Sequence, residues 1–358
     1  MSFERGLIVG KFCPLHKGHQ FLIETALEAC EQLIIISYTQ PEFAGCEAAK
    51  RASWLRALYP QAQHLVIDDR WLHVQMKDGV HGSHRRIPDN DAPEVEHRSF
   101  CAWLLERFCG GAVDAVFTSE AYGDGFARAL TDHFRETDLN QADIAHVCVD
   151  LARAKIPVSG TKIRENLYEH RADMEALVYA SMIQRVAFVG GESTGKSTLS
   201  EALAKQLKTE YVAEYGRDLW IEKDGKLVFD DYEHIARTQI AREEAAALSA
   251  RDFLFCDTTP LTTRFYCENQ FGRLSDGLRQ MSQRTYDHVF LCAADFGFVQ
   301  DGWRADPAFQ ARQQDWYRAE LASANIKYTN LAGSVEERMA RVISVLQLSG
   351  QAQDHRDG

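Results

Sequence analysis

Two segments of the chain share one pattern, in which a short apolar strand leads into a glycine-containing loop and then into a helix. The first strand covers residues 6–10 and its helix begins at about Lys17; the second covers residues 185–190 and its helix begins at about Lys196. This pattern is typical of the opening of an α/β domain. One hydrophobic core rarely extends beyond about 250–300 residues. A chain of 358 residues with two such openings is therefore predicted to form two domains.

Further strands are predicted from short apolar runs that alternate with helical stretches. The expected strands cover residues 33–37, 64–67, 112–117, 144–149, 210–213, 252–256, 288–292 and 326–330, and the expected helices include residues 232–249 and 307–323. We therefore assign residues 1–178 to a Rossmann-like domain, residues 184–348 to a second α/β domain, and residues 349–358 to a disordered tail, with parallel sheets in both domains. Residues 68–93 form a long polar stretch, so a loop that is either functional or mobile is expected there.

The net charge of −12 gives the chain no general attraction to nucleic acid or to anionic lipid. We therefore expect neither nucleic-acid binding nor membrane insertion. The N-terminus lacks a signal-peptide segment, and apolar runs such as residues 33–36 are far too short to cross a bilayer. The nine cysteines include no C-x-x-C pair, which favours reduced thiols in the cytoplasm over a zinc site or a disulfide framework. The sequence does not distinguish a monomer from a homo-oligomer.

The loop after the first strand reads Gly10-Lys-Phe-Cys-Pro-Leu-His16-Lys-Gly-His19. Gly10 ends the strand, where the absence of a side chain lets a ligand approach the backbone. His16 and His19 lie three residues apart at a helix start, so both rings can face one ligand beside the N–H groups of the helix N-terminus. The pattern predicts a phosphate site formed by Gly10, Lys11, Phe12, His16 and His19.

Residues 158–164 read Val-Ser-Gly-Thr-Lys-Ile-Arg near the end of the same domain. Ser159 and Thr161 can cap a helix and bind phosphate oxygens. Arg164 can hold a triphosphate through its forked guanidinium. We expect these three residues to contribute to the same phosphate site.

The loop after the second strand fits G-x-x-x-x-G-K-[ST] between a strand and a helix, which is the context of a P-loop. Its N–H groups are expected to hold the β-phosphate of ATP, Lys196 to reach the β and γ oxygens, and Ser197 to bind Mg²⁺. The predicted nucleotide-binding residues here are Gly190, Gly191, Glu192, Ser193, Thr194, Gly195, Lys196, Ser197 and Thr198.

Two carboxylates follow later strands of this second domain. Asp257 is the predicted Mg²⁺ ligand, whereas Glu214 is expected on the side where small P-loop kinases bind the phosphoryl acceptor. Residues 299–304 precede a helix and are expected to form a lid, with Arg304 closing over the phosphates and Asp301 near the substrate.

The first loop resembles the G-x-F-x-P-x-H-x-G-H signature of the nucleotidyltransferase superfamily, and residues 158–164 resemble its I-S-x-T-x-x-R motif. Within that superfamily it looks like a nicotinamide-nucleotide adenylyltransferase. The resemblance implies attack of a mononucleotide phosphate on the α-phosphorus of ATP, with His19 stabilising the transition state and His16, Lys11 and Arg164 holding phosphates. Related enzymes use pantetheine phosphate, so the acceptor stays open. Trp71 is equally consistent with stacking on a nicotinamide ring and with a structural role.

An adenylyltransferase followed by a P-loop kinase resembles the NadR family of bifunctional nicotinamide-mononucleotide adenylyltransferases and ribosylnicotinamide kinases. The P-loop, the segments Glu214-Tyr-Gly-Arg217 and Asp301-Gly-Trp-Arg304, and residues 257–263 carry this resemblance, which extends from about residue 6 to residue 346. It implies synthesis of NAD from ribosylnicotinamide with ATP and Mg²⁺. In that reaction Glu214, Lys196 and Asp257 are catalytic and Arg217 contacts the substrate.

The chain departs from the family pattern in two places. Some members begin with a DNA-binding helix-turn-helix domain, which we expect to be absent because the first strand starts near residue 6. The family often has Asp-Thr-Asp where this chain has Asp257-Thr258-Thr259. Two alternatives stay open: a kinase with a nearly silent adenylyltransferase, and a nucleotide sensor that signals to a partner such as a transporter or a promoter.

Overall fold

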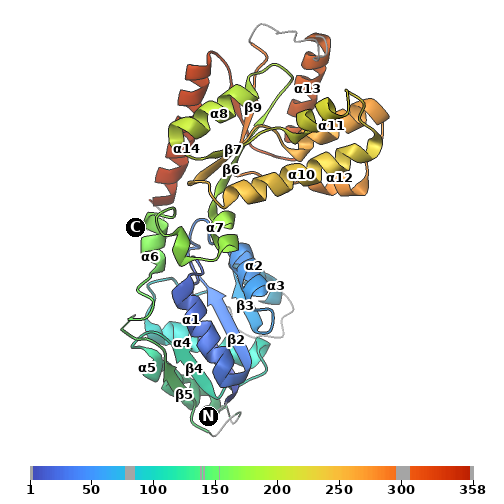
Figure 1. Cartoon of the computed structure of the whole chain (residues 1–358). Coiled ribbons are helices and arrows are strands. Elements are labelled where there is room, and N and C mark those ends of the chain that lie inside the picture. The colour runs from blue at the N-terminus through green and yellow to red at the C-terminus, as the bar shows by residue number, and fades with distance from the viewer. Residues whose placement is uncertain are drawn as a thin grey trace. The chain divides into compact units, whose positions relative to one another are not determined.

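The structure, a computed structural model, describes residues 3–76, 85–137, 139, 142–152, 154–295 and 307–354, with the backbone alone for residue 307 and residues 347–354. The described chain divides into two compact units between Val178 and Tyr179. Each unit is an α/β fold built on a parallel sheet of five strands (Figure 1). The predicted fold class, with a parallel sheet in both halves, is thus confirmed.

The first sheet is centred on its first strand, β1 (Phe3–Val9). Strands β2 (Cys30–Tyr38) and β4 (Ala115–Thr118) pair with it on either side, and β3 (Gln63–Ile67) and β5 (Ala145–Cys148) form the edges, in the order β3-β2-β1-β4-β5. The chain therefore moves to one side of β1 and later returns to the other. This change of direction leaves a crevice at the carboxyl ends of β1 and β4, where open α/β sheets bind ligands.

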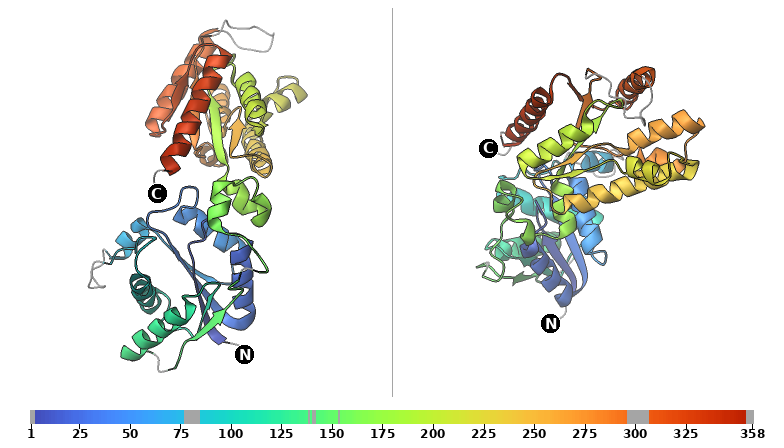
Figure 2. Two further views of the ribbon diagram at one scale, coloured as in Figure 1. Left: turned by 90° about the vertical axis from the view of Figure 1, so that its left-hand side faces the viewer. Right: turned by 45° about the horizontal axis from the view of Figure 1, so that its top comes forward.

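Helices cover both faces of the first sheet (Figure 2). Leu7, Ile36 and Val116 pack in one buried cluster with residues of α4 (Glu94–Phe108) and α5 (Gly123–Glu136). Ile8 and Ile35 alternate with these residues and are also fully buried, and the sheet contacts α1 (Lys17–Ala29) and α2 (Ala48–Leu58) as well. Burial on both faces explains why the central strands read as continuous apolar runs.

The stretch at residues 68–93 begins with a helix, α3 (Asp69–Met76), where the sequence predicted only a loop. The carboxylate of Asp68 accepts a hydrogen bond from the N–H of Trp71 at 2.6 Å in its first turn. Leu72 and Trp71 pack on the core cluster, so a single apolar face stabilises this mostly polar helix. The unit continues through α6 (Gly160–Glu165) and a 3₁₀ turn (Arg171–Asp173), and α7 (Ala176–Met182) leads into the next strand.

The second sheet is also centred on its first strand, β6 (Gln184–Val189). Strands β9 (His288–Cys292) and β8 (Phe253–Cys256) flank it, and β10 (Thr329–Leu331) and β7 (Glu210–Val212) form the edges, in the order β10-β9-β6-β8-β7. The loop that leaves β6 thus opens between the ends of β8 and β9.

The helices of this unit also lie on both faces of its sheet (Figure 1). Val186 and Phe188 share a core cluster with α8 (Lys196–Leu207) and α14 (Val335–Asp354), whereas Val189 shares another with α13 (Pro307–Ser323). The remaining helices are α9 (Tyr215–Glu222), α10 (Phe229–Ala247), α11 (Pro260–Phe271) and α12 (Asp276–Met281).

Helix α14 corrects the expected disordered tail in part, because it continues to Asp354 before the described residues end. The polar residues here include Gln351 and Gln353, which are good helix formers and can extend a helix that is already nucleated. Within the described ranges, no helix is long and apolar enough to cross a membrane.

Candidate active sites

The loop between β1 and α1 holds His16 and His19 as a pair. The N–H of His19 donates to Nδ1 of His16 at 3.3 Å, and the N–H of His16 donates to Nδ1 of His19 at 3.4 Å. The two rings stack with their centroids 3.7 Å apart. Because both Nδ1 atoms accept a hydrogen bond, each neutral ring carries its proton on Nε2. The N-cap and first turn of α1 therefore hold two stacked imidazole rings.

The second motif lies directly against this loop. Ser159 caps α6, with its Oγ accepting from the N–H of Lys162 at 3.3 Å. The guanidinium of Arg164 donates to the carbonyl oxygen of Cys13 and to Thr161 Oγ1. A Cβ on Gly160 would lie 2.6 Å from that same carbonyl oxygen, so a side chain there would push the two motifs apart. Residues more than 140 positions apart in the sequence thus form one site.

The cations of this site are gathered around one aromatic ring. Phe43 lies 4.3 Å from the guanidinium of Arg164 and 5.8 Å from the ammonium of Lys11. Lys11 also donates to the carbonyl oxygen of Asn90 at 3.2 Å. Burial lowers the pKa of Lys11, and the nearby Arg164 lowers it further. An anion placed between these two side chains would relieve their mutual repulsion.

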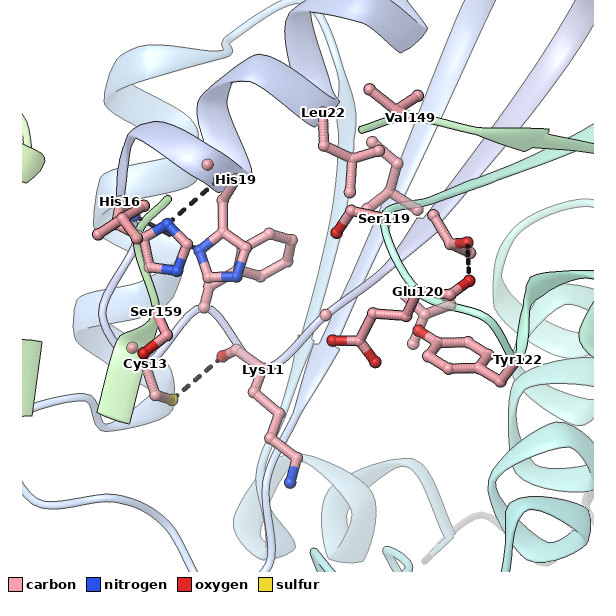
Figure 3. A pocket seen from close by; sticks show the side chains of 18 of the residues that line it. Lys11, Cys13, His16, His19, Leu22, Ser119, Glu120, Tyr122, Val149 and Ser159 are labelled. Carbon is pink, nitrogen blue, oxygen red and sulfur yellow. Dashed lines mark hydrogen bonds between the residues drawn. The ribbon is translucent and has the colours of Figure 1, made fainter. Parts of the chain in front are cut away.

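A cavity of about 620 Å³ joins these residues at the carboxyl ends of β1 and β4. Its lining includes the predicted phosphate-site residues Gly10, Lys11, Phe12, His16, His19, Ser159, Thr161 and Arg164. In Figure 3 the two histidines lie on one side and Glu120 and Tyr122 on the opposite side. Sequence reasoning missed these two residues. The available signal was the polar pair Ser119-Glu120 directly after the buried strand β4.

Trp71 corrects one expectation of the sequence. Its ring packs edge-to-face on Phe108 at a centroid distance of 4.9 Å and belongs to the rim of the core cluster. It does not line the cavity described above. The packing supports the structural alternative for Trp71 over stacking on a substrate ring, because the helix α3 turns the side chain toward the core.

The P-loop connects β6 to α8 in the conformation that its glycines permit. Gly190 has a φ of 140°, and a Cβ there would lie 2.7 Å from the carbonyl oxygen of Cys292. Gly195 has a φ of 79° and caps α8. The ammonium of Lys196 donates to the carbonyl oxygens of Gly190 and Gly191 at 3.0 and 2.8 Å. The side chain of Lys196 therefore folds back onto the loop, at the place where a phosphate group is expected to bind.

The base of the P-loop is fixed by buried polar side chains. Thr194 Oγ1 donates to the carbonyl oxygen of Gly191 at 2.8 Å, and its own carbonyl oxygen accepts from Arg338 at 2.8 Å. Arg338, on α14, is 1% exposed and also bonds the carboxylate of Asp295. A buried cation with its donors satisfied makes this end of the loop rigid.

The two predicted carboxylates lie together beside the P-loop. Asp257 accepts hydrogen bonds from the hydroxyl of Ser197 and from the backbone N–H of Glu214, while burial raises its pKa. Burial, and next the charge of Asp257, raise the pKa of Glu214 to about 7, against the opposing effects of Lys196 and Arg217. Carboxylate and hydroxyl oxygens are the ligands that Mg²⁺ prefers, so Ser197 and Asp257 fit the predicted metal role.

The other predicted residues of this site differ in what the structure says of them. Thr198 is exposed in the first turn of α8, and Arg217 lies on α9 close enough to influence both carboxylates. Asp301 and Arg304, together with the expected lid, lie outside the described residues.

Comparison with known proteins connects both halves of the chain to one group. The AAA domain family model matches residues 185–338. The trifunctional NAD biosynthesis/regulator proteins NadR of Salmonella typhimurium and Escherichia coli K12 are each 28% identical over 316 residues, which is 84% of this chain and 71% of theirs.

Solved structures agree with this fold over nearly the whole chain. A crystal structure of NadR protein in complex with NAD and AMP-PNP has a TM-score of 0.57 at 21% identity, and covers 93% of this chain and 92% of its own. A NadR structure in complex with NR has a TM-score of 0.59 at 19% identity, with coverages of 98% and 97%. The chain is therefore a NadR-like protein, in which a P-loop domain follows a first α/β domain.

Proposed function

We propose that this protein makes NAD in two ATP-dependent steps, one in each domain. The second domain phosphorylates ribosylnicotinamide to nicotinamide mononucleotide. The first domain transfers the adenylyl group of a second ATP to that mononucleotide and releases pyrophosphate. The proposal is supported by the role of the similar NadR proteins in NAD biosynthesis, and by the residues that line the cavity of the first domain and surround the P-loop of the second.

The adenylyl transfer needs positioning and charge neutralisation rather than a protein nucleophile. The 5′-phosphate of the mononucleotide attacks the α-phosphorus of ATP, and the bond to the β-phosphate oxygen breaks. Negative charge then grows on the oxygens around the α-phosphorus and on pyrophosphate. His19 donates an Nε2–H to these oxygens, while His16, Lys11 and Arg164 hold the remaining phosphates.

In the phosphoryl transfer, Lys196 contacts the β and γ oxygens of ATP. Ser197 and Asp257 would hold Mg²⁺, which would neutralise phosphate charge when bound. Glu214 accepts the proton of the acceptor's 5′-hydroxyl as that oxygen attacks the γ-phosphorus, and the bond from the γ-phosphorus to the β–γ bridging oxygen breaks to release ADP. A carboxylate whose pKa lies near 7 is well matched to this task at neutral pH.

One observation carries the proposal: in each domain the described candidate side chains gather at one loop between a strand and a helix, around the cavity in the first domain and beside Lys196 in the second. The test is to incubate the protein with ATP, Mg²⁺ and separate nucleosides and mononucleotides, and to identify the products by mass. We expect ribosylnicotinamide to yield its mononucleotide and then NAD. Accumulation of the mononucleotide alone would favour a kinase with a silent adenylyltransferase, and binding without turnover would favour a sensor.

A further inference from the structure

The backbone of Glu192, the third residue of the P-loop, is hydrogen-bonded to α13. Its N–H donates to Gln313 Oε1 at 2.9 Å, and its carbonyl oxygen accepts from Gln310 Nε2. The N–H of Gly191 donates to Gln314 Oε1 at 3.0 Å. These three glutamines of α13 are at most 8% exposed. The peptide groups of residues 191 and 192 are therefore bound by the protein, which leaves only the later residues of the loop to hold phosphate.

The side chain of Glu192 is also fixed. Its Oε1 accepts a hydrogen bond from the hydroxyl of Tyr266, on α11, at 2.8 Å. Tyr266 is partly buried, and desolvation followed by the charges of Glu214 and Glu192 raises its pKa. Glu192 also contributes to the raised pKa of Glu214. The carboxylate of Glu192 thus lies near Glu214, on the side of the loop where the acceptor is proposed to bind.

The sequence predicted that the N–H groups of the P-loop, including that of Glu192, bind nucleotide, but the Glu192 side chain is chemically unsuited to hold a phosphate group. A carboxylate accepts hydrogen bonds and repels phosphate oxygens. It can, however, accept from the hydroxyl groups of a sugar, which carry no charge. The charges of Asp257 and Glu192 both act on Glu214, where Lys196 and Arg217 oppose them. The same two cations also act on Asp257. The balance of charge among these side chains favours an uncharged or cationic acceptor over a phosphorylated one.

We propose that Glu192 binds the ribose hydroxyls of a nucleoside acceptor, so that the loop that holds the phosphoryl donor also positions the acceptor. This inference rests on the proposed kinase function and deepens it. Gln310 and Gln313 are positioning residues that fix the backbone of Glu192, and Tyr266 orients its carboxylate. The acceptor class is a nucleoside without a 5′-phosphate.

The experiment measures binding by calorimetry and turnover by coupled assay for the full chain and for Glu192→Gln, which keeps the shape of the side chain and removes its charge. Ribosylnicotinamide and AMP-PNP are the probes. We expect the Kd and KM for ribosylnicotinamide to rise roughly 10- to 100-fold, the scale of one hydrogen bond to a charged group, with the Kd for AMP-PNP within about twofold. The matched control is Glu201→Gln, an exposed acid on α8, which should change neither value.

Deoxy analogues of the nucleoside make the assignment specific. In the unsubstituted protein, removing the 2′- or the 3′-hydroxyl should weaken binding about as much as Glu192→Gln does, and in the variant that removal should cost little more. The proposal would be overturned if removal of either hydroxyl weakened binding to Glu192→Gln as much as it weakens binding to the unsubstituted protein. It would also be overturned if Glu192→Gln lost as much affinity for AMP-PNP as for ribosylnicotinamide. The adenylyltransferase activity of the same preparations reports whether the chain is intact. If the unsubstituted protein neither binds nor phosphorylates ribosylnicotinamide, the proposed function fails, and so does the acceptor class assigned to Glu192.

Discussion

The raised pKa of Glu214 determines how the proposed kinase reaction should depend on pH. Burial and the neighbouring charge of Asp257 raise that pKa to about 7. Only the ionised carboxylate can accept the proton of the attacking hydroxyl. With a pKa near 7, roughly one tenth of the molecules carry the base form at pH 6 and roughly nine tenths at pH 8. An ordinary glutamate would be almost fully ionised at both values.

The assay is kcat/KM for ribosylnicotinamide from about pH 5.5 to about pH 8.5, because kcat/KM reports the groups of the free enzyme. We expect kcat/KM to fall about tenfold for each unit below the pKa and to level off above it. Glu214→Gln should lower the plateau by about 10²–10⁴ and remove the acid limb. Glu222→Gln, which changes an exposed acid at the end of α9, should keep the limb unchanged. A flat profile for the unsubstituted protein, or an acid limb that survives in Glu214→Gln, would refute the assignment of Glu214 as the base.

Three further predictions separate the two sites. His19→Ala should slow NAD formation from nicotinamide mononucleotide by roughly a hundredfold, the scale of one lost transition-state donor, and leave riboside phosphorylation unchanged; loss of both activities would contradict two independent sites. Asp257→Asn should raise the Mg²⁺ concentration needed for half-maximal kinase turnover, whereas Glu214→Gln should not; added Mg²⁺ that rescues only the Glu214 variant would exchange the two roles. Cutting the chain between residues 171 and 184 should give two soluble fragments that each bind ATP in calorimetry, and failure of both would show that each site needs the other half.

Both loops that the sequence assigns to phosphate could be located from the sequence because each depends on local features. A strand, a loop of fixed length and a helix N-terminus lie within about 20 consecutive residues, and glycine or histidine at a given position has few other uses. The positions of the strands followed from apolar runs that are buried on both faces. In both sheets the first strand is central, so each motif opens at a change of strand direction.

The side of the first-domain cavity that lies opposite its loop could not be predicted from the sequence in the same way. Glu120 and Tyr122 reach the first site only because β4 pairs with β1, a contact across more than 100 residues. Trp71 looked available in a polar stretch, yet Leu72 and the cap at Asp68 make that stretch a helix that packs on the core. Pairwise packing of this kind leaves no periodic signal in a single sequence.

Glu192 shows why a motif predicts the path of the backbone better than the task of a side chain. The P-loop pattern assigns all of its residues to phosphate, because the pattern is defined by the loop conformation. The direction of the Glu192 carboxylate depends instead on Gln310 and Gln313, more than 110 residues later, and on Tyr266. Those contacts tie the loop to α11 and α13. A displacement of about 1 Å in a positioning residue can cost about a hundredfold in rate. We therefore expect the glutamines of α13, which bind the backbone of Glu192, to affect how donor and acceptor are aligned in the proposed reaction.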